Sequence, residues 1–456
     1  MWAWRHVLAN TAPSALQTAT GPAPRAGTGP PCSLLFVSSL HFSSSLRPAG
    51  PARPGGPMQI RLSTLLTLGL LSGLTPFAID MYLPSLPAIA QDLDSTIELA
   101  QLSVTAYLGV FALAQLVLGP ASDVLGRRAT IGGGLALFCL GALMCVLAER
   151  METLLLGRAV QGLGGAAVAV TVPALVRDLF ERDHYARVMS LVMLTTALAP
   201  LLAPSIGGAI VSYLEWHWVF VALLVLGLTA SGLFFRLIPE TLLHADRHPP
   251  ELARVLRNYL TLLRHRVGLG YLLTGAFSFG GMMTYIVTSP FVYIELHGVP
   301  VGWFGVFFGA NVALAMVVTS QNARLVVRLG AERLLRLGLG VQVVSALILL
   351  GLAIWGTPPL WAIVGATMLY LGMAGVVLGN SMAGFMAHFA RMAGTASAFS
   401  GASRFGLGAV MGSLVSLMHT GDATPMLFGM ALCGLAAGAS YWLLCCPSVS
   451  DVSKMG

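Results

Sequence analysis

Long apolar runs recur along most of the chain and are separated by short polar segments. A helix that spans a membrane needs ~20 consecutive, mainly apolar residues. Runs of that length fall near 62–84, 99–121, 129–148, 153–176, 188–213, 216–238, 267–292, 300–323, 334–355, 360–386, 395–417 and 424–445. The stretch 337–390 has no Asp, Glu, Lys or Arg, and the turn Trp355-Gly-Thr-Pro-Pro-Leu360 divides it into two spans. The pattern predicts an all-α membrane protein with twelve transmembrane helices.

The positions of the basic residues test this count independently. Cytoplasmic segments of membrane proteins carry an excess of Lys and Arg. With the N-terminus inside, 22 of the 25 basic residues fall in cytoplasmic segments, only Arg150 lies outside, and Arg158 and Arg404 lie within spans. A missed or additional helix would invert this bias for every later loop. The distribution therefore predicts that both termini are cytoplasmic.

Composition excludes several classes of protein. The chain is 56% apolar and 9% charged, with a mean hydropathy of +0.81, whereas a soluble domain carries about 25% charged residues. The net charge of +7 does not indicate nucleic-acid binding, because the basic residues form short clusters between apolar runs. The six cysteines form no paired framework, and the spans contain neither paired acids nor a His/Cys cluster. We therefore expect no enzyme, no metal site and no cofactor.

The largest hydrophilic connection, residues 239–266, follows the sixth span. It separates a six-helix bundle at 58–238 from a second at 267–445, the layout of transporters built from two related halves. The basic, glycine-containing turns Gly119–Arg128 and Asn322–Arg333 form a weak echo between these halves. Residues 446–456 are expected to be a cytoplasmic tail.

Residues 1–57 contain nine prolines and no acidic residue, and their apolar run is too short to span a bilayer. Three interpretations stay open: a start site assigned too early, a disordered cytoplasmic tail, or a targeting segment. We assign no function to this extension.

Ionisable residues within a span are costly and are functional hypotheses by default. At 1.5 Å per residue, Arg158 is about 8 Å deep and Asp80 about 10 Å deep from the outer surface, so both are expected to face one cavity. Burial disfavours a charged carboxylate and a neighbouring arginine favours it. Asp80 can then load and release a proton as access to the cavity changes. The alternative is a permanent ion pair, or an Asp that fixes the proline-rich helix end.

Other polar residues of the spans are assigned by position. Arg158 keeps its charge, so it tunes Asp80, binds polar substrate atoms or only packs helices. Arg404 lines the cavity or extends to the membrane surface. By helix position and polarity, the other cavity candidates are Tyr82, Tyr107, Gln115, Tyr285 and Asn311, each equally compatible with a packing role.

The fifth span has an unusual set of prolines and glycines. It contains Pro200 and Pro204, then Gly207 and Gly208. Proline removes a helix hydrogen bond, and glycine lets a neighbouring helix approach closely. We expect a bent, tightly packed helix suited to the interface between the halves.

Together these segments resemble the major facilitator superfamily from Met58 to about Pro447. Gly119-Pro-Ala-Ser-Asp-Val-Leu-Gly-Arg-Arg128 is similar to the loop motif between its second and third helices. Leu156-Gly-Arg-Ala-Val-Gln-Gly-Leu-Gly-Gly-Ala-Ala167 is similar to its fourth-helix motif. Ala203-Pro-Ser-Ile-Gly-Gly208 is similar to the fifth-helix motif of drug/proton antiporters, with Ala203 where glycine is usual.

Three further segments resemble the bicyclomycin/chloramphenicol-resistance (Bcr/CflA) subfamily. They are Ile79-Asp-Met-Tyr-Leu-Pro-Ser-Leu-Pro87, Trp216-His-Trp-Val-Phe220 (where Trp-Arg is the commoner pair) and Pro239-Glu-Thr-Leu242. The resemblance implies that Asp80 is the proton-coupling acid and Arg158 the fourth-helix arginine. It also implies a cytoplasmic charge cluster that stabilises one access state, built from Gly119, Asp123, Gly126, Arg127 and Arg128 with Asp178 as a partner.

The resemblance implies a proton-coupled efflux transporter for antibiotics in a bacterial inner membrane. Its partners would be a small amphipathic drug, protons and the lipid bilayer, and it would work as a monomer driven by the proton gradient, without a cofactor. Fold alone does not fix function. The alternative is an exporter or proton symporter of a sugar or another small metabolite on the same fold.

Overall fold

The computed structural model describes residues 62–180, 182–241, 252–418 and 420–446, so the predictions for residues 1–57 and for the tail after Cys446 lie outside the described residues. The first half contains α1 (Leu62–Asp80), η1 (Leu83–Ser85), α2 (Leu86–Asp92), α3 (Ile97–Leu125), α4 (Arg127–Val146), α5 (Met151–Leu179), α6 (Arg182–Tyr213) and α7 (His217–Leu237). The second contains α8 (Leu252–Arg264), α9 (Arg266–Pro290), η3 (Phe291–Leu296), α10 (Val301–Leu329), α11 (Ala331–Trp355), α12 (Leu360–His388), η4 (Ala390–Met392), α13 (Ala393–Leu417) and α14 (Thr424–Leu444).

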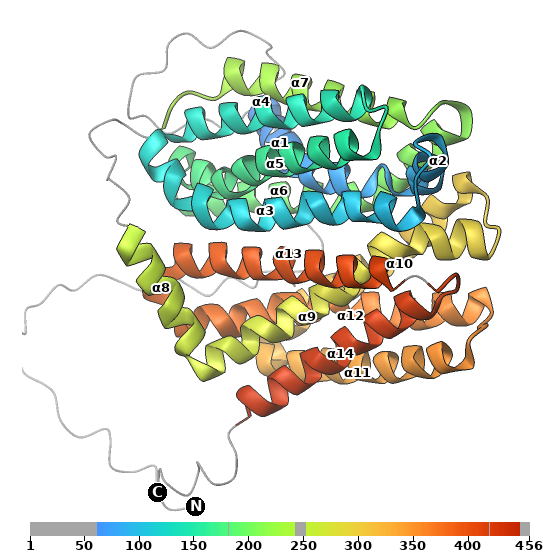
Figure 1. Ribbon diagram of the computed structural model, residues 1–456. Coiled ribbons are helices and arrows are strands. Elements are labelled where there is room, and N and C mark those ends of the chain that lie inside the picture. The colour runs from blue at the N-terminus through green and yellow to red at the C-terminus, as the bar shows by residue number, and fades with distance from the viewer. Residues whose placement is uncertain (1–61, 181, 242–251, 419, 447–456) are drawn as a thin grey trace, which may run out of the picture. The chain divides into compact units, whose positions relative to one another are not determined.

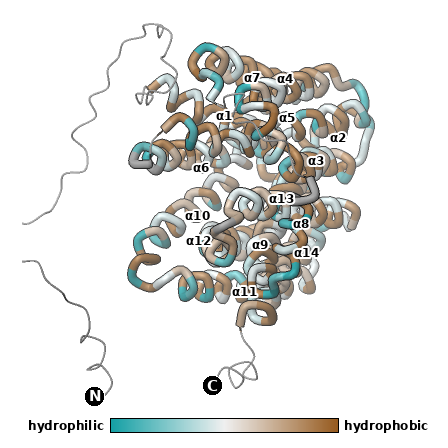
Figure 2. The backbone as a smooth tube through the Cα atoms, turned by 90° about the vertical axis from the view of Figure 1, so that its left-hand side faces the viewer, coloured by the Kyte–Doolittle hydropathy of each residue, from teal (hydrophilic) through white to brown (hydrophobic). Residues whose placement is uncertain are grey.

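Eleven of the described helices are long and apolar enough to cross a bilayer. Helix α13 is the twelfth long helix of the bundle; its 25 residues suffice for a span, but Arg404 and many Ser and Gly residues make it less apolar. Large apolar side chains such as Leu113, Ile354 and Trp361 are exposed on the long helices, and hydrophobic residues follow these helices along their length (Figure 2). The chain is thus a multi-pass membrane protein.

The two halves repeat one packing scheme. In the first half α4 packs on α5 and α7, α3 packs on α5, and α1 packs on α6 and α7. In the second half α11 packs on α12 and α14, α10 packs on α12, and α9 packs on α13 and α14. The contacts between the halves obey the same symmetry, because α3 packs on α13 as α10 packs on α6 (Figure 1). The predicted pair of pseudo-symmetric bundles is therefore present.

The turn before the third helix of each half is the same. Gly126 precedes α4 with φ 95° and ψ 154°, and Gly330 precedes α11 with φ 79° and ψ 150°. Residues other than glycine rarely adopt such positive φ angles. The similarity between the loops Gly119–Arg128 and Asn322–Arg333 thus extends to their backbone conformation. We call this end of the bundle the α8 end and the opposite end, where α1 stops, the Asp80 end.

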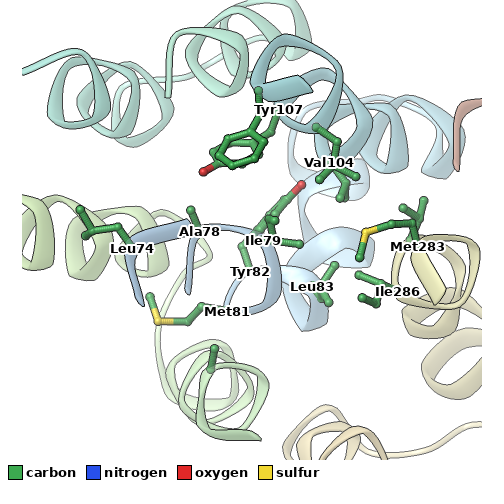
Figure 3. Close-up of a cluster of buried hydrophobic side chains, with 14 of the residues drawn as sticks. Leu74, Ala78, Ile79, Met81, Tyr82, Leu83, Val104, Tyr107, Met283 and Ile286 are labelled. Carbon is green, nitrogen blue, oxygen red and sulfur yellow. The ribbon is translucent and has the colours of Figure 1, made fainter. Parts of the chain in front are cut away.

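The first span differs from its predicted form. It was expected near 62–84, whereas α1 ends at Asp80 and the chain continues as η1 and α2. Pro84 and Pro87 stand in the first turns of these two helices, where a missing N–H is tolerated. Leu83 of η1 then packs in one buried cluster with Met283 and Ile286 of α9, which joins the halves at the Asp80 end (Figure 3).

The central connection is also more ordered than expected. Residues 239–266 were treated as a loop, yet they contain the 13-residue helix α8. Leu252, Leu256, Tyr259, Leu260 and Leu263 follow a helical spacing that the sequence analysis did not use. Helix α8 packs on α9 and α13 rather than crossing the bundle.

Candidate functional site

Arg158 of α5 is fully buried within the first half. Its guanidinium carbon lies 4.2 Å from the centre of the Tyr82 ring, 4.6 Å from that of Tyr107 and 5.9 Å from that of Phe220. One terminal nitrogen donates a hydrogen bond to Gln161 Oε1 at 2.5 Å. Nε and Nη2 have no hydrogen-bond partner among the described residues. The cation is thus held by the faces of aromatic rings, an arrangement that is favourable when water is excluded.

The glycines of the fourth-helix motif place this arginine. A Cβ on Gly162 would lie 2.5 Å from the Tyr107 carbonyl oxygen, and one on Gly165 would overlap the Tyr107 hydroxyl. On the other side of α5, a Cβ on Gly164 would overlap the backbone of Gly134 and Phe138 in α4. Small residues let transmembrane helices approach closely. The motif therefore packs α5 against both α3 and α4.

Asp80 is the last residue of α1 and is 4% exposed. It lies eleven residues, or about three helical turns, after Gly69, where an added Cβ would lie 3.0 Å from Thr195 of α6. Asp80 is therefore on the face of α1 that is turned toward α6. Within the described part of the chain, its carboxylate makes no hydrogen bond or ion pair.

The structure does not bring Asp80 and Arg158 together. Thr75 of α1 accepts a hydrogen bond from the Tyr107 hydroxyl of α3 at 3.3 Å. The hydroxyl of Tyr82, in the turn after α1, lies 3.3 Å from Ser103 Oγ of α3. Asp80, five residues after Thr75, lies on a different side of α1. Equal depth along two helices does not fix the direction in which their side chains point, so the expectation that both residues face one cavity stays a prediction.

The loop motif forms a charge cluster at the α8 end. Arg127 is buried, with its Nη2 2.6 Å from Asp123 Oδ1 and its Nε 3.2 Å from Asp178 Oδ2. It also donates to Ser122 Oγ at 2.6 Å. The structure thus places Asp178 of α5 where the sequence analysis expected a partner, and joins the ends of α3, α4 and α5.

Two other residues of the loop motif hold different contacts. Arg128 donates to the Phe235 carbonyl oxygen of α7 at 2.9 Å and lies over the Phe235 ring. A Cβ on Gly119 would lie 3.8 Å from Ala398, an ordinary contact across the boundary between α3 and α13.

Glu240, which follows α7, completes this cluster and was missed as a functional residue. Its two carboxylate oxygens accept hydrogen bonds from the backbone N–H groups of Arg127 and Arg128 at 3.1 and 3.2 Å. A carboxylate at a helix N-terminus satisfies unpaired N–H groups and is favoured by the helix dipole. Glu240 belongs to the subfamily segment Pro239–Leu242, but its partner Arg127 lies 113 residues away in the chain.

The second half has a cluster of reversed polarity at the equivalent place. Glu332, two residues after Gly330, accepts hydrogen bonds from Tyr271 at 2.7 Å and from Tyr441. Arg336 lies 3.3 Å from Glu332 and donates to the Tyr441 hydroxyl at 2.8 Å. This network joins α9, α11 and α14, as the first cluster joins the helix ends of its own half.

The fifth-span motif lies in α6 and contacts both halves. Pro200, Ala203 and Pro204 lie inside the unbroken helix, and a Cβ on Gly207 would overlap the carbonyl oxygen of Met81. A Cβ on Gly208 would lie 3.0 Å from the carbonyl oxygen of Val301, the first residue of α10. The end of α1, α6 and the second half therefore meet through backbone atoms at the Asp80 end.

The cavity candidates fall into three separate groups. Tyr82 and Tyr107 hold Arg158, whereas Tyr285 accepts a hydrogen bond from Asn311 Nδ2 at 3.0 Å within the second half. Gln115 and Arg404 lie at the boundary: a Cβ on Gly401 of α13 would overlap Gln115 Oε1. Arg404 donates to the Leu378 carbonyl oxygen at 3.0 Å, while its Nε has no partner among the described residues.

A row of aromatic side chains crosses the boundary between the two halves. The Tyr107 and Phe111 rings stack at 5.9 Å, Phe111 meets Phe405 of α13 edge-on at 4.6 Å, and Phe405 meets Phe279 of α9 at 4.9 Å. This row of rings was not predicted from the sequence, because single phenylalanines are common in membrane spans. These rings join α3 to α13 and α9, and Phe405 directly follows Arg404 in the chain.

The subfamily segments near Trp216 have a structural role at the Asp80 end. Trp216 donates from its indole N–H to Asp92 Oδ2 at 2.8 Å and stacks on His217 at 3.6 Å. The contact ties the start of α7 to the end of α2, which follows the Asp80 segment.

Comparisons with known proteins agree with this architecture. A Bicyclomycin resistance protein homolog of Haemophilus influenzae is 39% identical over 83% of this chain and 95% of its own length. The Multidrug resistance protein MdtL of Escherichia coli is 30% identical over 54% of this chain and 62% of its own length. A crystal structure of a peptide transporter POT in complex with sulfate superposes with a TM-score of 0.69 at 14% identity, over 88% of this chain and 97% of that one, and so shows the fold alone.

The family model of the Major Facilitator Superfamily matches residues 68–413. The relatives and the fold are those of transporters rather than enzymes, and the resemblance to the bicyclomycin-resistance branch is confirmed by the Haemophilus relative. The chain belongs to the Major Facilitator Superfamily.

Proposed function

We propose that the chain is a proton-coupled exporter of small amphipathic antibiotics in a bacterial inner membrane. The observation that best supports this proposal is the 39% identity to the Bicyclomycin resistance protein homolog over 95% of that relative. The name of this relative refers to bicyclomycin resistance, and the name of the MdtL relative refers to multidrug resistance. The exporter acts as a monomer, needs no cofactor besides the proton gradient, and alternates access by rocking its two halves.

Asp80 is the proposed site of proton loading. A carboxylate buried without an ion pair in the described part of the chain is costly when it is charged. Protonation removes that cost, and opening of the Asp80 end to water lets the carboxyl group release its proton to the solvent. Since Asp80 faces α6 rather than Arg158, the charge change acts on the α1–α6 contact. In this proposal Arg158 does not exchange the proton and instead stabilises α1 and α3 around Tyr82 and Tyr107.

The row of aromatic side chains and Arg404 are the proposed substrate-contacting surface. Phe111 and Phe405 offer apolar faces on both sides of the boundary, which suits the apolar body of an amphipathic molecule. The unpartnered Nε of Arg404 is a donor for an acceptor oxygen of that molecule. Asp123, Asp178 and Arg127 hold the α8 end in one access state.

The test uses the full chain in proteoliposomes, with chloramphenicol as the probe and an internal pH dye as the readout. Wild type should move protons opposite to the drug, and Asp80→Asn should abolish this movement while circular dichroism stays unchanged. The matched control is Asp94→Asn, which removes an exposed carboxylate in the loop that follows α2. Proton movement that persists in Asp80→Asn would exclude Asp80 as the coupling group. Movement in the same direction as the solute would favour a symporter.

A further inference from the structure

Helix α8 and the two residues after it are basic. Residues 252–266 contain four arginines and no acidic residue. The helix lies between the last helix of the first half and the first helix of the second, outside the spans. Its side chains divide into a docked face and an open face.

The docked face contacts both halves. Leu262 is fully buried in a cluster with Leu272, Phe385 and Phe389. The Tyr259 hydroxyl donates to the Leu116 carbonyl oxygen of α3 at 3.1 Å, and its ring stacks on Phe399 of α13 at 5.2 Å. Helix α8 thus lies across the seam between α3 and α13.

The open face combines apolar and cationic side chains. Leu256, Leu260 and Leu263 follow the i, i+4, i+7 spacing of one helix stripe and are 61%, 46% and 45% exposed. Arg257 and Arg264, one residue after the first and last of these leucines, form an adjacent exposed stripe. An apolar stripe beside arginines is typical of a helix that lies in the surface of a bilayer.

The position of α8 fits that environment. It crosses the ends of α9 and α13 at a steep angle (Figure 1), so it runs along the end of the bundle rather than through it. The apolar outer surfaces of the long helices extend to the α8 end of the bundle. The open face therefore continues the surface that the protein already shares with the bilayer, and its positive charge complements anionic headgroups.

We propose that the open face of α8 binds the headgroups of anionic phospholipids through Arg257 and Arg264, with Leu256, Leu260 and Leu263 in the acyl region. Bound lipid then holds α8 on the α3–α13 seam through Tyr259. This stabilises the arrangement in which the two helices are in contact at the α8 end. The inference concerns the membrane surface and does not depend on the proposed substrate or on proton coupling.

The test is hydrogen–deuterium exchange of residues 252–266 in nanodiscs of phosphatidylcholine, with or without phosphatidylglycerol. Phosphatidylglycerol should slow exchange in wild type. A basic side chain at an anionic surface strengthens binding about fivefold, so Arg257→Gln with Arg264→Gln should lose up to about 25-fold of this protection. High salt should reduce it as well. Peptides at the adjoining ends of α3 and α13 should follow α8 in wild type and lose this coupling in Tyr259→Phe.

The matched control is Arg324→Gln with Arg328→Gln, which removes two exposed arginines of α10 at the same end. This variant should keep the full effect of phosphatidylglycerol. Equal protection in both lipids, or an equal loss in the control variant, would overturn the proposal. Protection that appears only with a co-purified acidic protein, and not with lipid, would overturn it in favour of a protein partner.

Discussion

The guanidinium of Arg158 lies 4.2 Å from the centre of the Tyr82 ring, while the Tyr82 hydroxyl contacts Ser103 Oγ at 3.3 Å. Tyr82 therefore joins a buried cation to α3 through two different parts of one side chain. The ring face offsets part of the free-energy cost of burying the Arg158 charge. Among the described residues, Asp80 forms no ion pair with Arg158 that would offset it as well. The two roles can be separated by substitution.

Tyr82→Phe should keep the ring over Arg158 and lose only the hydroxyl contact, whereas Tyr82→Leu should lose both. A desolvated cation–π contact contributes about 2 kcal/mol. We therefore expect a larger fall in thermal stability in detergent for Tyr82→Leu than for Tyr82→Phe. Equal falls for the two variants would show that the ring face does not stabilise Arg158.

Glu240→Gln should weaken the N-terminus of α4. The carboxylate accepts from two backbone N–H groups, and removing its charge also removes the favourable interaction with the helix dipole. A lost N-terminal cap costs about 0.5–2 kcal/mol. Thermal unfolding in detergent, followed by circular dichroism, measures this loss. Glu149→Gln, an exposed acid in the turn at the opposite end of α4, is the control and should change little.

Gly207→Ala should separate α6 from the end of α1, because the new Cβ would overlap a carbonyl oxygen of Met81. We expect reduced thermal stability and a slower conformational cycle. Gly133→Ala is the matched control, since a Cβ there has no heavy atom within 4 Å. A cysteine introduced at the Asp80 end should react faster with a membrane-impermeant maleimide in Gly207→Ala, and its rate should not change in Gly133→Ala. An unchanged accessibility would contradict a tight contact at Gly207.

The reactivity of Cys445 should depend on pH in an unusual range. Burial, together with the nearby Glu332 and Cys446, raises the pKa of the Cys445 thiol to about 12, whereas an ordinary cysteine has a pKa of about 8.5. The thiolate is the reactive form, and a raised pKa keeps the thiol protonated at neutral pH. In a variant with Cys445 as its one cysteine, maleimide labelling should still rise about tenfold per pH unit between pH 9 and 10. A plateau near pH 9 would contradict the raised pKa.

The helices could be predicted because the bilayer imposes them. A span must be long and apolar, and the loops must carry charge, so residue type alone locates the long helices from α1 to α14. Helix α13 was found in spite of Arg404, since its apolar length is sufficient. Helix α8 was missed because the prolines and charges of its segment indicated a loop, although its leucines had helical spacing.

The site was less predictable, because depth in the membrane follows from sequence and direction does not. Asp80 and Arg158 were placed at similar depth, yet the packing of α1 turns them to different neighbours. Asp178 was located because the resemblance to the superfamily implies a charge cluster around Arg127. Glu240 contacts Arg127 and Arg128, and Glu332 contacts Tyr271 and Tyr441, across chain distances that no spacing rule links. The Glu332–Arg336 pair alone among these contacts follows the i,i+4 spacing of a helix.

The contact of Gly207 with Met81 has a mechanical consequence. The carbonyl group of Met81, directly after α1, lies against Gly207 of α6. Gly208 of the same helix lies close to the carbonyl oxygen of Val301 in the other bundle. A displacement at the tip of α1 reaches the far bundle with no rotatable side chain in between to absorb it. Transmission along this route is insensitive to most changes of residue type and is interrupted only when one of the two glycines is lost.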